Sequence, residues 1–281
     1  MTECIRRDDP RYPQALGDLS MPPAQLYALG EWETLQSPVV AIVGTRDPTG
    51  YGLRTTRAIA SALARAGVSV ISGMARGIDA AAHRAALEVQ GRTVAVMGTG
   101  IDVPYPTGHR QLHQLLSDKG LVLSEYGSGV RAHAGAFPRR NRIIAALAPV
   151  TLVIEAGARS GALNTAGQAL DLGRTVAAVP GPIDSRQSAG TNELIRDGAT
   201  VIASVDDALS LLGVDAVPRA RDVELEEKDS RVWKSLAEGG LDVDTLAARS
   251  NLPARECLAA ITSLEILGMV ECLLTGEVRR R

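Results

Sequence analysis

Short apolar segments alternate along this chain with stretches of helical periodicity, and glycines follow most of the apolar segments. Residues 39–43 are apolar throughout, as expected of a strand that helices cover on both faces of a sheet. Strands and helices that alternate at this spacing predict an α/β fold with a doubly wound, mostly parallel sheet. The expected strands are residues 39–43, 68–72, 93–97, 121–124, 150–155, 175–179 and 200–203.

The length of 281 residues suggests one large domain and one small domain. We expect residues 1–37, which lack clear periodicity, to form a lead-in segment that docks on a domain of residues 38–213. An acid-rich linker is expected over residues 214–229. Residues 230–281 are expected to form three helices and a hairpin, which resembles a winged helix. A protein-interaction or dimerisation module is the alternative for this unit.

Charge and cysteine content exclude several classes of protein. The net charge of −2 argues against a general polyanion binder, so any binding of nucleic acid must come from a local patch. Cys4, Cys257 and Cys272 are too scattered for a disulfide framework or a metal motif. The N-terminus lacks a signal-type apolar region, and no apolar run approaches 18 residues. We therefore expect a cytoplasmic protein with no membrane association, metal or cofactor.

A basic patch follows the single phenylalanine of the chain, Phe137. Pro138 suits the first turn of a helix, and Arg139, Arg140 and Arg142 come next. Helix N-termini favour anions, so this charge is better explained by an anionic ligand such as a phosphate backbone. An aromatic ring beside cations suits single-stranded nucleic acid. The alternative is a core phenylalanine beside a solvated arginine face.

Ligands of such sheets bind outside the carboxyl ends of the strands, so Arg46, Arg76, Glu155 and Ser160 are expected at one rim. The turn that contains Gly44 and Arg46 lacks the spacing of a dinucleotide fingerprint. Its backbone N–H groups and its arginine could still hold a phosphate. The alternative is an ordinary turn with an exposed arginine.

The most enzyme-like group consists of Glu155, Ser160, Gly161 and Thr165. A carboxylate at a strand end and a serine-capped glycine turn could bind a nucleotide phosphate and perform acid–base chemistry. A capped helix whose acid accepts bonds from turn amides explains the group equally well.

The four histidines give no sign of catalysis or of a metal site. We expect His83 to bond to Asp79 in a structural role, because the two are one helical turn apart and no nucleophile accompanies them. His109 and His113 are spaced i, i+4 but lack a third ligand nearby.

Together these motifs closely resemble the DNA-processing protein A family, called DprA or Smf. The resemblance covers about residues 10–212, with the motifs in order. The matching runs are VGTR (43–46), SGMARGID (72–79), GTGID (98–102), YP (105–106), SEY (124–126), FPRRNRII (137–144), EA (155–156), SGALNTA (160–166) and VPG (179–181).

The resemblance implies an extended Rossmann-like domain that binds single-stranded DNA and helps to load RecA, chiefly in natural transformation, without being an enzyme. It also implies a homodimer, with Asn192, Ile195 and Val201 in the matching segment. The C-terminal unit resembles the winged-helix module that many members carry. The residues expected to bind DNA are Gly44, Arg46, Arg76, Phe137, Arg139, Arg140, Asn141, Arg142, Ser160 and Gly161.

The chain departs from the family pattern in two places. Residues 1–37 are too few for the helical SAM-type domain of many members, so we expect that domain to be absent. Members often place a basic residue just before the Phe-Pro pair, where this chain has Ala134, Gly135 and Ala136. Arg131 or His133 would have to substitute for it.

The alternative function is a nucleotide-cleaving hydrolase of the LOG or lysine-decarboxylase-like type, which the region 155–165 resembles. Its usual Pro-Gly-Gly-x-Gly-Thr-x-x-Glu run is missing. A dehydrogenase that uses NAD is disfavoured because the dinucleotide fingerprint is absent.

Overall fold

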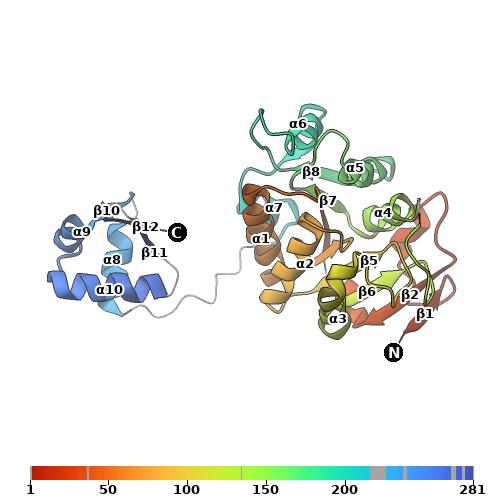
Figure 1. The fold of residues 1–281 in the computed structure, drawn as a ribbon, viewed down its shortest axis with the longest axis horizontal. Helices are drawn as coiled ribbons and strands as arrows, with labels where there is room; N and C mark the ends of the chain where they lie inside the picture. The colour runs from red at the N-terminus through yellow and green to blue at the C-terminus, as the bar shows by residue number, and fades with distance from the viewer. Residues whose placement is uncertain are drawn as a thin grey trace. The chain divides into compact units, whose positions relative to one another are not determined.

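The computed structural model describes residues 2–36, 38–133, 135–215, 226–236, 239–266, 270–273 and 276–280. The chain divides into two units, Met1–Val217 and Pro218–Arg281 (Figure 1). No helix among the described residues combines the length and the apolar character needed to cross a bilayer.

A nine-stranded sheet in the order β1-β2-β6-β5-β4-β3-β7-β8-β9 organises the first unit. The seven strands from β3 onward pair in parallel, whereas β1 pairs with β2 and β2 with β6 in antiparallel fashion. The predicted doubly wound, mostly parallel sheet is thus confirmed. The strands are β1 (Glu3–Arg6), β2 (Gln25–Gly30), β3 (Val39–Val43), β4 (Ser69–Ser72), β5 (Thr93–Met97), β6 (Leu121–Ser124), β7 (Val150–Val153), β8 (Thr175–Ala178) and β9 (Thr200–Val201).

Helices cover both faces of this sheet (Figure 1). The helices are α1 (Gly50–Arg65), α2 (Ile78–Glu88), α3 (Arg110–Lys119), α4 (Ala136–Leu147), α5 (Gly161–Asp171), α6 (Ala189–Arg196) and α7 (Val205–Leu211), with 3-10 turns η1 (Gln14–Asp18), η2 (Trp32–Gln36) and η3 (Thr107–His109). Along β3, Val40 and Ile42 pack with α1, α2 and α7, whereas Ala41 and Val43 pack with α4 and α5. This alternation explains why β3 is apolar at every position.

The lead-in segment contributes two strands that its sequence did not reveal. Cys4 pairs with Tyr27 between β1 and β2, and Tyr27 pairs with Ser124 of β6, so residues 3–30 extend one edge of the sheet. Leu26 and Ala28 of β2 are buried, whereas Gln25, Tyr27 and Leu29 between and beside them are partly exposed and Gly30 is exposed.

The chain reverses direction across the sheet after β6. Strands β3 to β6 follow one another toward one edge, and α4 then carries the chain back to β7, which pairs with the other side of β3. After β3 the chain therefore continues toward β4 on one side, and after β7 it continues toward β8 on the other side. The turns that follow these two neighbouring strands lead in opposite directions. This is the switch point at which doubly wound sheets bind ligands.

The second unit contains α8 (Glu227–Ser235), β10 (Leu241–Asp242), α9 (Val243–Ser250), α10 (Ala254–Ile266), β11 (Val270–Cys272) and β12 (Glu277–Arg280). Its core includes Val232, Leu246 and Leu264, and its three strands pair in the order β10-β12-β11. The predicted three helices and hairpin are confirmed, and the short strand β10 adds to them. Residues 216–225, which are most of the expected linker, and residues 237–238, 267–269 and 274–275 lie outside the described residues.

Candidate nucleic-acid interface

A cleft of about 610 Å³ opens at the switch point of the sheet. Its walls come from the turn after β3, the first turns of α4, and the turn between β7 and α5. The sequence placed Arg46, Arg76, Glu155 and Ser160 at one rim, and of these the cleft lining includes Arg46 and Ser160. The first turns of α4 join them there. Of the residues expected to bind DNA, those that line the cleft are Gly44, Arg46, Phe137, Arg140, Asn141, Ser160 and Gly161.

Phe137 is half-buried and has partners on several sides. The guanidinium carbon of Arg46 lies 5.5 Å from the centroid of its ring. The ring of Tyr105 lies 5.0 Å away between centroids, tilted by 35°. Gly98, at the end of β5, lies so close that an added Cβ would come within 2.8 Å of the Phe137 ring. Phe137 is therefore held in place at the mouth of the cleft rather than packed in the core.

Tyr105 is a site residue that sequence reasoning missed. Its side chain is 38% exposed and packs on Phe137. Tyr105 and Pro106 belong to a run that matches the family, but nothing in the local sequence gives Tyr105 a role. Arg159 is a second such residue, because it is exposed and lines the cleft from the turn after β7. Its place in a glycine turn at the rim, like that of Arg46, was the signal that could have identified it.

Arg140 forms the floor of the cleft and is almost completely buried. Its Nη1 donates to the carbonyl oxygens of Gly73 and Val96, each at 2.5 Å, and its Nε donates to Oδ1 of Asn141 at 3.1 Å. Burial lowers the pKa of Arg140 to about 10, while the nearby carboxylate of Asp79 opposes this shift. The side chain remains charged at neutral pH and supplies fixed positive charge beneath the cleft.

Helix α5 directs its N-terminus at the same cleft. Oγ of Ser160 accepts from the backbone N–H of Ala162 at 3.3 Å, which caps the helix. Nδ2 of Asn141 donates to Oδ1 of Asn164 at 3.3 Å and links α4 to α5. The free N–H groups and the dipole of α5 favour an anion at this position.

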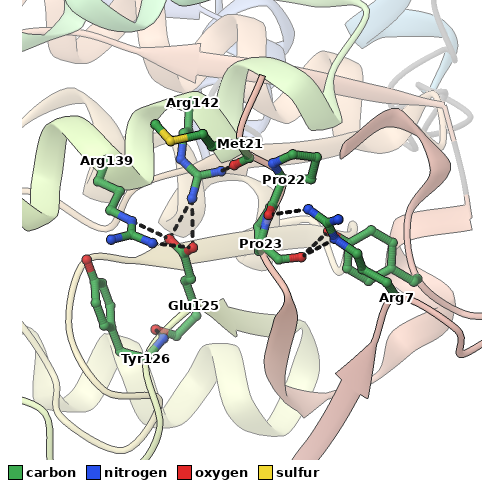
Figure 2. Close-up of polar contacts among 10 residues, drawn as sticks. Arg7, Met21, Pro22, Pro23, Glu125, Tyr126, Arg139 and Arg142 are labelled. Atoms are coloured by element: carbon green, nitrogen blue, oxygen red, sulfur yellow. Dashed lines mark hydrogen bonds and ion pairs between the residues drawn. The ribbon is translucent and has the colours of Figure 1, made fainter. Parts of the chain in front are cut away.

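Arg139 and Arg142 do not belong to the lining of the cleft. Their guanidinium groups meet the carboxylate of Glu125, which follows β6 (Figure 2). Arg139 donates to the two carboxylate oxygens of Glu125 at 3.1 and 3.0 Å, and Arg142 contacts both oxygens at 2.7 Å. Arg142 is 9% exposed and also donates to the carbonyl oxygen of Met21 at 2.8 Å. The sequence predicted an anionic ligand for these arginines, whereas in the structure both pair with Glu125 of the chain itself. That Arg139 and Arg142 bind DNA stays a prediction.

The remaining basic residues of the region lie outside the cleft lining. Arg76 is exposed in the turn between β4 and α2. Arg131 and His133 are exposed in the loop before α4, whereas Ala134 lies outside the described residues. That one of them replaces the family's basic residue stays a prediction.

Glu155 serves as a structural acceptor. Its Oε2 accepts from the backbone N–H of Thr49 at 2.9 Å, and its Oε1 accepts from the Thr49 hydroxyl at 2.5 Å. The side chain is 2% exposed and does not belong to the described lining of the cleft. This geometry matches the capped-helix interpretation, in which the acid accepts bonds from turn groups. It leaves Glu155 badly placed to transfer a proton to a ligand.

The expected hydrogen bond between His83 and Asp79 is wrong. Nδ1 of His83 lies 2.7 Å from the hydroxyl of Thr93 on β5, whereas Asp79 accepts from the backbone N–H of Ala75 at 3.3 Å. His83 points toward the sheet, and Asp79 faces the turn at the start of its helix. Burial lowers the pKa of His83 to about 3, so the ring is neutral at physiological pH.

His109 and His113 bond to the carbonyl oxygens of Met74 and Ile101. Within the described part of the chain, His, Cys, Asp and Glu side chains form no group of three that could hold a metal ion.

The residues expected at a dimer interface lie at the opposite edge of the sheet from β1. Val201 is 45% exposed on the edge strand β9, and Ile195 is half-buried on α6. Asn192 exchanges hydrogen bonds with the backbone of Gly181. Ile183, in the loop before α6, is 99% exposed. Dimerisation through this edge stays a prediction.

Comparison with known proteins matches the chain to one family. The family described as DNA recombination-mediator protein A matches residues 3–213, and the DprA winged helix domain matches residues 216–273. A DNA processing protein DprA of Mycobacterium tuberculosis is 42% identical over 261 residues, which cover 89% of this chain and 67% of that protein.

Two solved structures share the fold. DprA from Streptococcus pneumoniae has a TM-score of 0.71 and 39% identity, over 74% of this chain and 73% of that chain. DprA from Helicobacter pylori, described for its mode of binding single-stranded DNA, has a TM-score of 0.69 and 32% identity, over 75% of this chain and 95% of that chain.

Proposed function

The chain belongs to the DNA recombination-mediator protein A family, and on this premise we propose that it binds single-stranded DNA in the cleft at the switch point of its sheet. The proposal rests above all on one observation, the partly exposed ring of Phe137 with the guanidinium of Arg46 over it. Single-stranded nucleic acid is held by an aromatic face for a base and cations for the phosphates. The Helicobacter pylori relative, described as binding single-stranded DNA, supports the same ligand.

The surroundings of Phe137 suit a phosphate backbone. Arg46 and Arg159 are exposed cations at the rim of the cleft, and Arg140 adds buried charge at its floor. The capped N-terminus of α5 favours an anion between them. These features are local, which reconciles anion binding with the net charge of −2.

We propose further that the protein is a mediator rather than an enzyme. The carboxylate of Glu155, the best catalytic candidate in the sequence, is buried and bonded to Thr49. The alternative hydrolase would release free base from nucleoside monophosphates, and we expect no such release. Measurable, Glu155-dependent release would contradict the proposal.

As a mediator in the cytoplasm, the protein would load RecA onto single-stranded DNA, as a homodimer formed through Asn192, Ile195 and Val201. Natural transformation is the process that the family resemblance suggests. RecA filament assembly on DNA coated with single-strand-binding protein tests the loading step. Sedimentation velocity of the wild type and of an Ile195→Glu variant tests the dimer, because a charge in an apolar interface should yield monomers.

Fluorescence anisotropy of a labelled oligo-dT, titrated with the wild-type protein at two salt concentrations, tests the DNA-binding role itself. We expect binding that weakens as salt rises, because phosphate contacts release counterions. Binding of duplex DNA of the same length serves as the comparison. A preference for duplex would shift attention from the cleft to the winged helix.

A further inference from the structure

The carboxylate of Glu125 forms ion pairs with two guanidinium groups. Figure 2 shows Glu125, which follows β6, between Arg139 and Arg142 of α4. Together the three side chains carry one more positive charge than negative. The cluster therefore still attracts an anion, although both arginines already have a carboxylate partner.

The two arginines are held very differently. The side chain of Arg142 is 11% exposed, and it bonds to Glu125 and to the carbonyl oxygen of Met21. Backbone oxygens of Pro22 and Pro23, next to Met21, accept bonds from Arg7, so this segment is itself fixed (Figure 2). A buried pair of this kind is costly to break, because either partner would be left as an uncompensated charge.

Arg139 is held only at the surface. Its side chain is 59% exposed, and the hydrogen bonds that the structure describes for its guanidinium all go to Glu125. The Glu125 side chain is 11% exposed, so only the arginine end of this ion pair faces solvent, where its attraction is weakened and screened by salt. Of the two arginines, Arg139 can therefore leave Glu125 at little cost while Arg142 stays.

The contact between Arg139 and Glu125 also has the geometry of a phosphate contact. Nε and Nη2 each donate to a different carboxylate oxygen, in the bidentate arrangement that a guanidinium uses for carboxylates and phosphates alike. Arg139 lies two residues beyond Phe137 on α4 and, unlike Phe137, does not line the cleft. A DNA strand that stacks a base on Phe137 would need to cross the start of α4 to reach Arg139.

We propose that Glu125 occupies the place of a DNA phosphate at Arg139 in the free protein. When a single strand binds, Arg139 passes from Glu125 to a backbone phosphate, and Arg142 keeps Glu125 in position. This inference rests on the proposed function and adds two points to it. The bound DNA strand continues over the N-terminal turn of α4. Glu125 limits the affinity for DNA because it competes with the DNA for Arg139.

A double-mutant cycle with Glu125→Gln, Arg139→Ala and the combined variant tests the competition, with oligo-dT anisotropy as the readout. The amide that replaces the carboxylate keeps its shape but lacks its charge, so it competes less for Arg139. We expect Glu125→Gln to tighten binding about two- to fivefold, the range that an exposed ion pair is worth. In the Arg139→Ala background the same change should give no gain.

The cycle separates competition from a general charge effect. If the gain were merely the loss of a negative charge near the DNA, it would persist in the Arg139→Ala background and overturn the inference. A loss of affinity for Glu125→Gln that is equal in both backgrounds would also overturn it, because Glu125 would then only support α4. Absence of wild-type binding would defeat the proposed function, and with it this inference.

Because Glu125→Gln leaves Arg142 buried without a charged partner, a second measurement uses the wild-type protein. The Nε–H resonance of Arg139, assigned with an Arg139→Lys variant, is followed by ¹⁵N NMR as oligo-dT is added. We expect it to shift with saturation of the DNA site, while Arg57, paired with Glu88 on the α1–α2 surface, stays unchanged. An unmoved Arg139 resonance at full DNA occupancy would overturn the inference.

Discussion

The guanidinium of Arg46 lies over the ring of Phe137, with its central carbon 5.5 Å from the ring centroid. Arg46 lies in the turn after β3 and Phe137 in the first turn of α4, so the pair joins two of the three segments that form the walls of the cleft. A cation over an aromatic face is stabilised by the ring quadrupole. The contact holds the proposed phosphate-binding group and the proposed base-stacking surface side by side in the free protein.

Replacement of Arg46 by Ala should weaken oligo-dT binding and lower its dependence on salt. One phosphate contact contributes about 0.7 to the slope of log K against log salt for single strands, so the slope should fall by about that amount. Arg57→Ala, an exposed arginine of α1 outside the cleft lining, is the matched control and should leave the slope unchanged. An unchanged slope in Arg46→Ala would remove Arg46 from the phosphate site.

Tyr105 should contribute to DNA binding through Phe137. Tyr105→Ala removes an aromatic pair whose interaction is worth about 0.5–1.5 kcal/mol, so the Phe137 ring loses its support and affinity should fall by a similar amount. Tyr105→Phe keeps the ring and should bind as the wild type does. Equal losses for the two variants would assign the effect to the hydroxyl group instead of the ring.

Glu155→Gln should destabilise the fold without abolishing DNA binding. Both carboxylate oxygens accept bonds from Thr49 in a buried site, and hydrogen bonds to a charged group are worth about 1.5–3 kcal/mol. Urea denaturation should show the free energy of unfolding reduced by about this amount. Loss of DNA binding in a variant that remains folded would instead place Glu155 in the site.

The neutral state of His83 should make stability depend on pH. Its pKa is about 3 in the folded protein against 6.5 for the free side chain, because burial disfavours the charged ring. The unfolded chain therefore binds more protons between these values. The stability that His83 contributes is fully present above about pH 6.5 and is lost as the pH falls toward 3.

Denaturation at pH 7.5, 6 and 5 measures this dependence. The contribution of His83 should reach at most about 1.4 kcal/mol per pH unit. A His83→Gln variant lacks the titrating group, so its stability should fall less steeply as the pH is lowered. Parallel curves for the two proteins would contradict a neutral, buried His83.

The sequence revealed the parallel strands because both of their faces are buried. Residues such as Val40 and Ala41 are apolar whichever way they point, and glycines mark the ends of several strands. The same pattern placed Arg46 and Ser160 at the rim, where both line the cleft. The edge strand β1 and its neighbour β2 escaped notice because most of their positions are at least partly exposed and their pairing is antiparallel.

The partners of charged and polar side chains could not be predicted in this way. The sequence showed an excess of arginine after Phe137, but not that Glu125 neutralises part of it, because that contact joins two elements across the end of the sheet. Helical spacing suggested a bond between His83 and Asp79, yet the ring bonds to Thr93 on a strand. Spacing within one helix carries no information about the neighbouring strand.

The most direct test of the central claim compares Phe137→Ala with Tyr51→Ala in oligo-dT anisotropy titrations at two salt concentrations. Tyr51 is a partly exposed aromatic residue on α1 that does not line the described cleft, so it controls for the loss of a ring. We predict that Phe137→Ala weakens binding by about 1–3 kcal/mol at both salt concentrations, the value of one base–aromatic stack, and that Tyr51→Ala binds as the wild type does. Equal affinities for wild type and Phe137→Ala would contradict the assignment of DNA binding to this cleft.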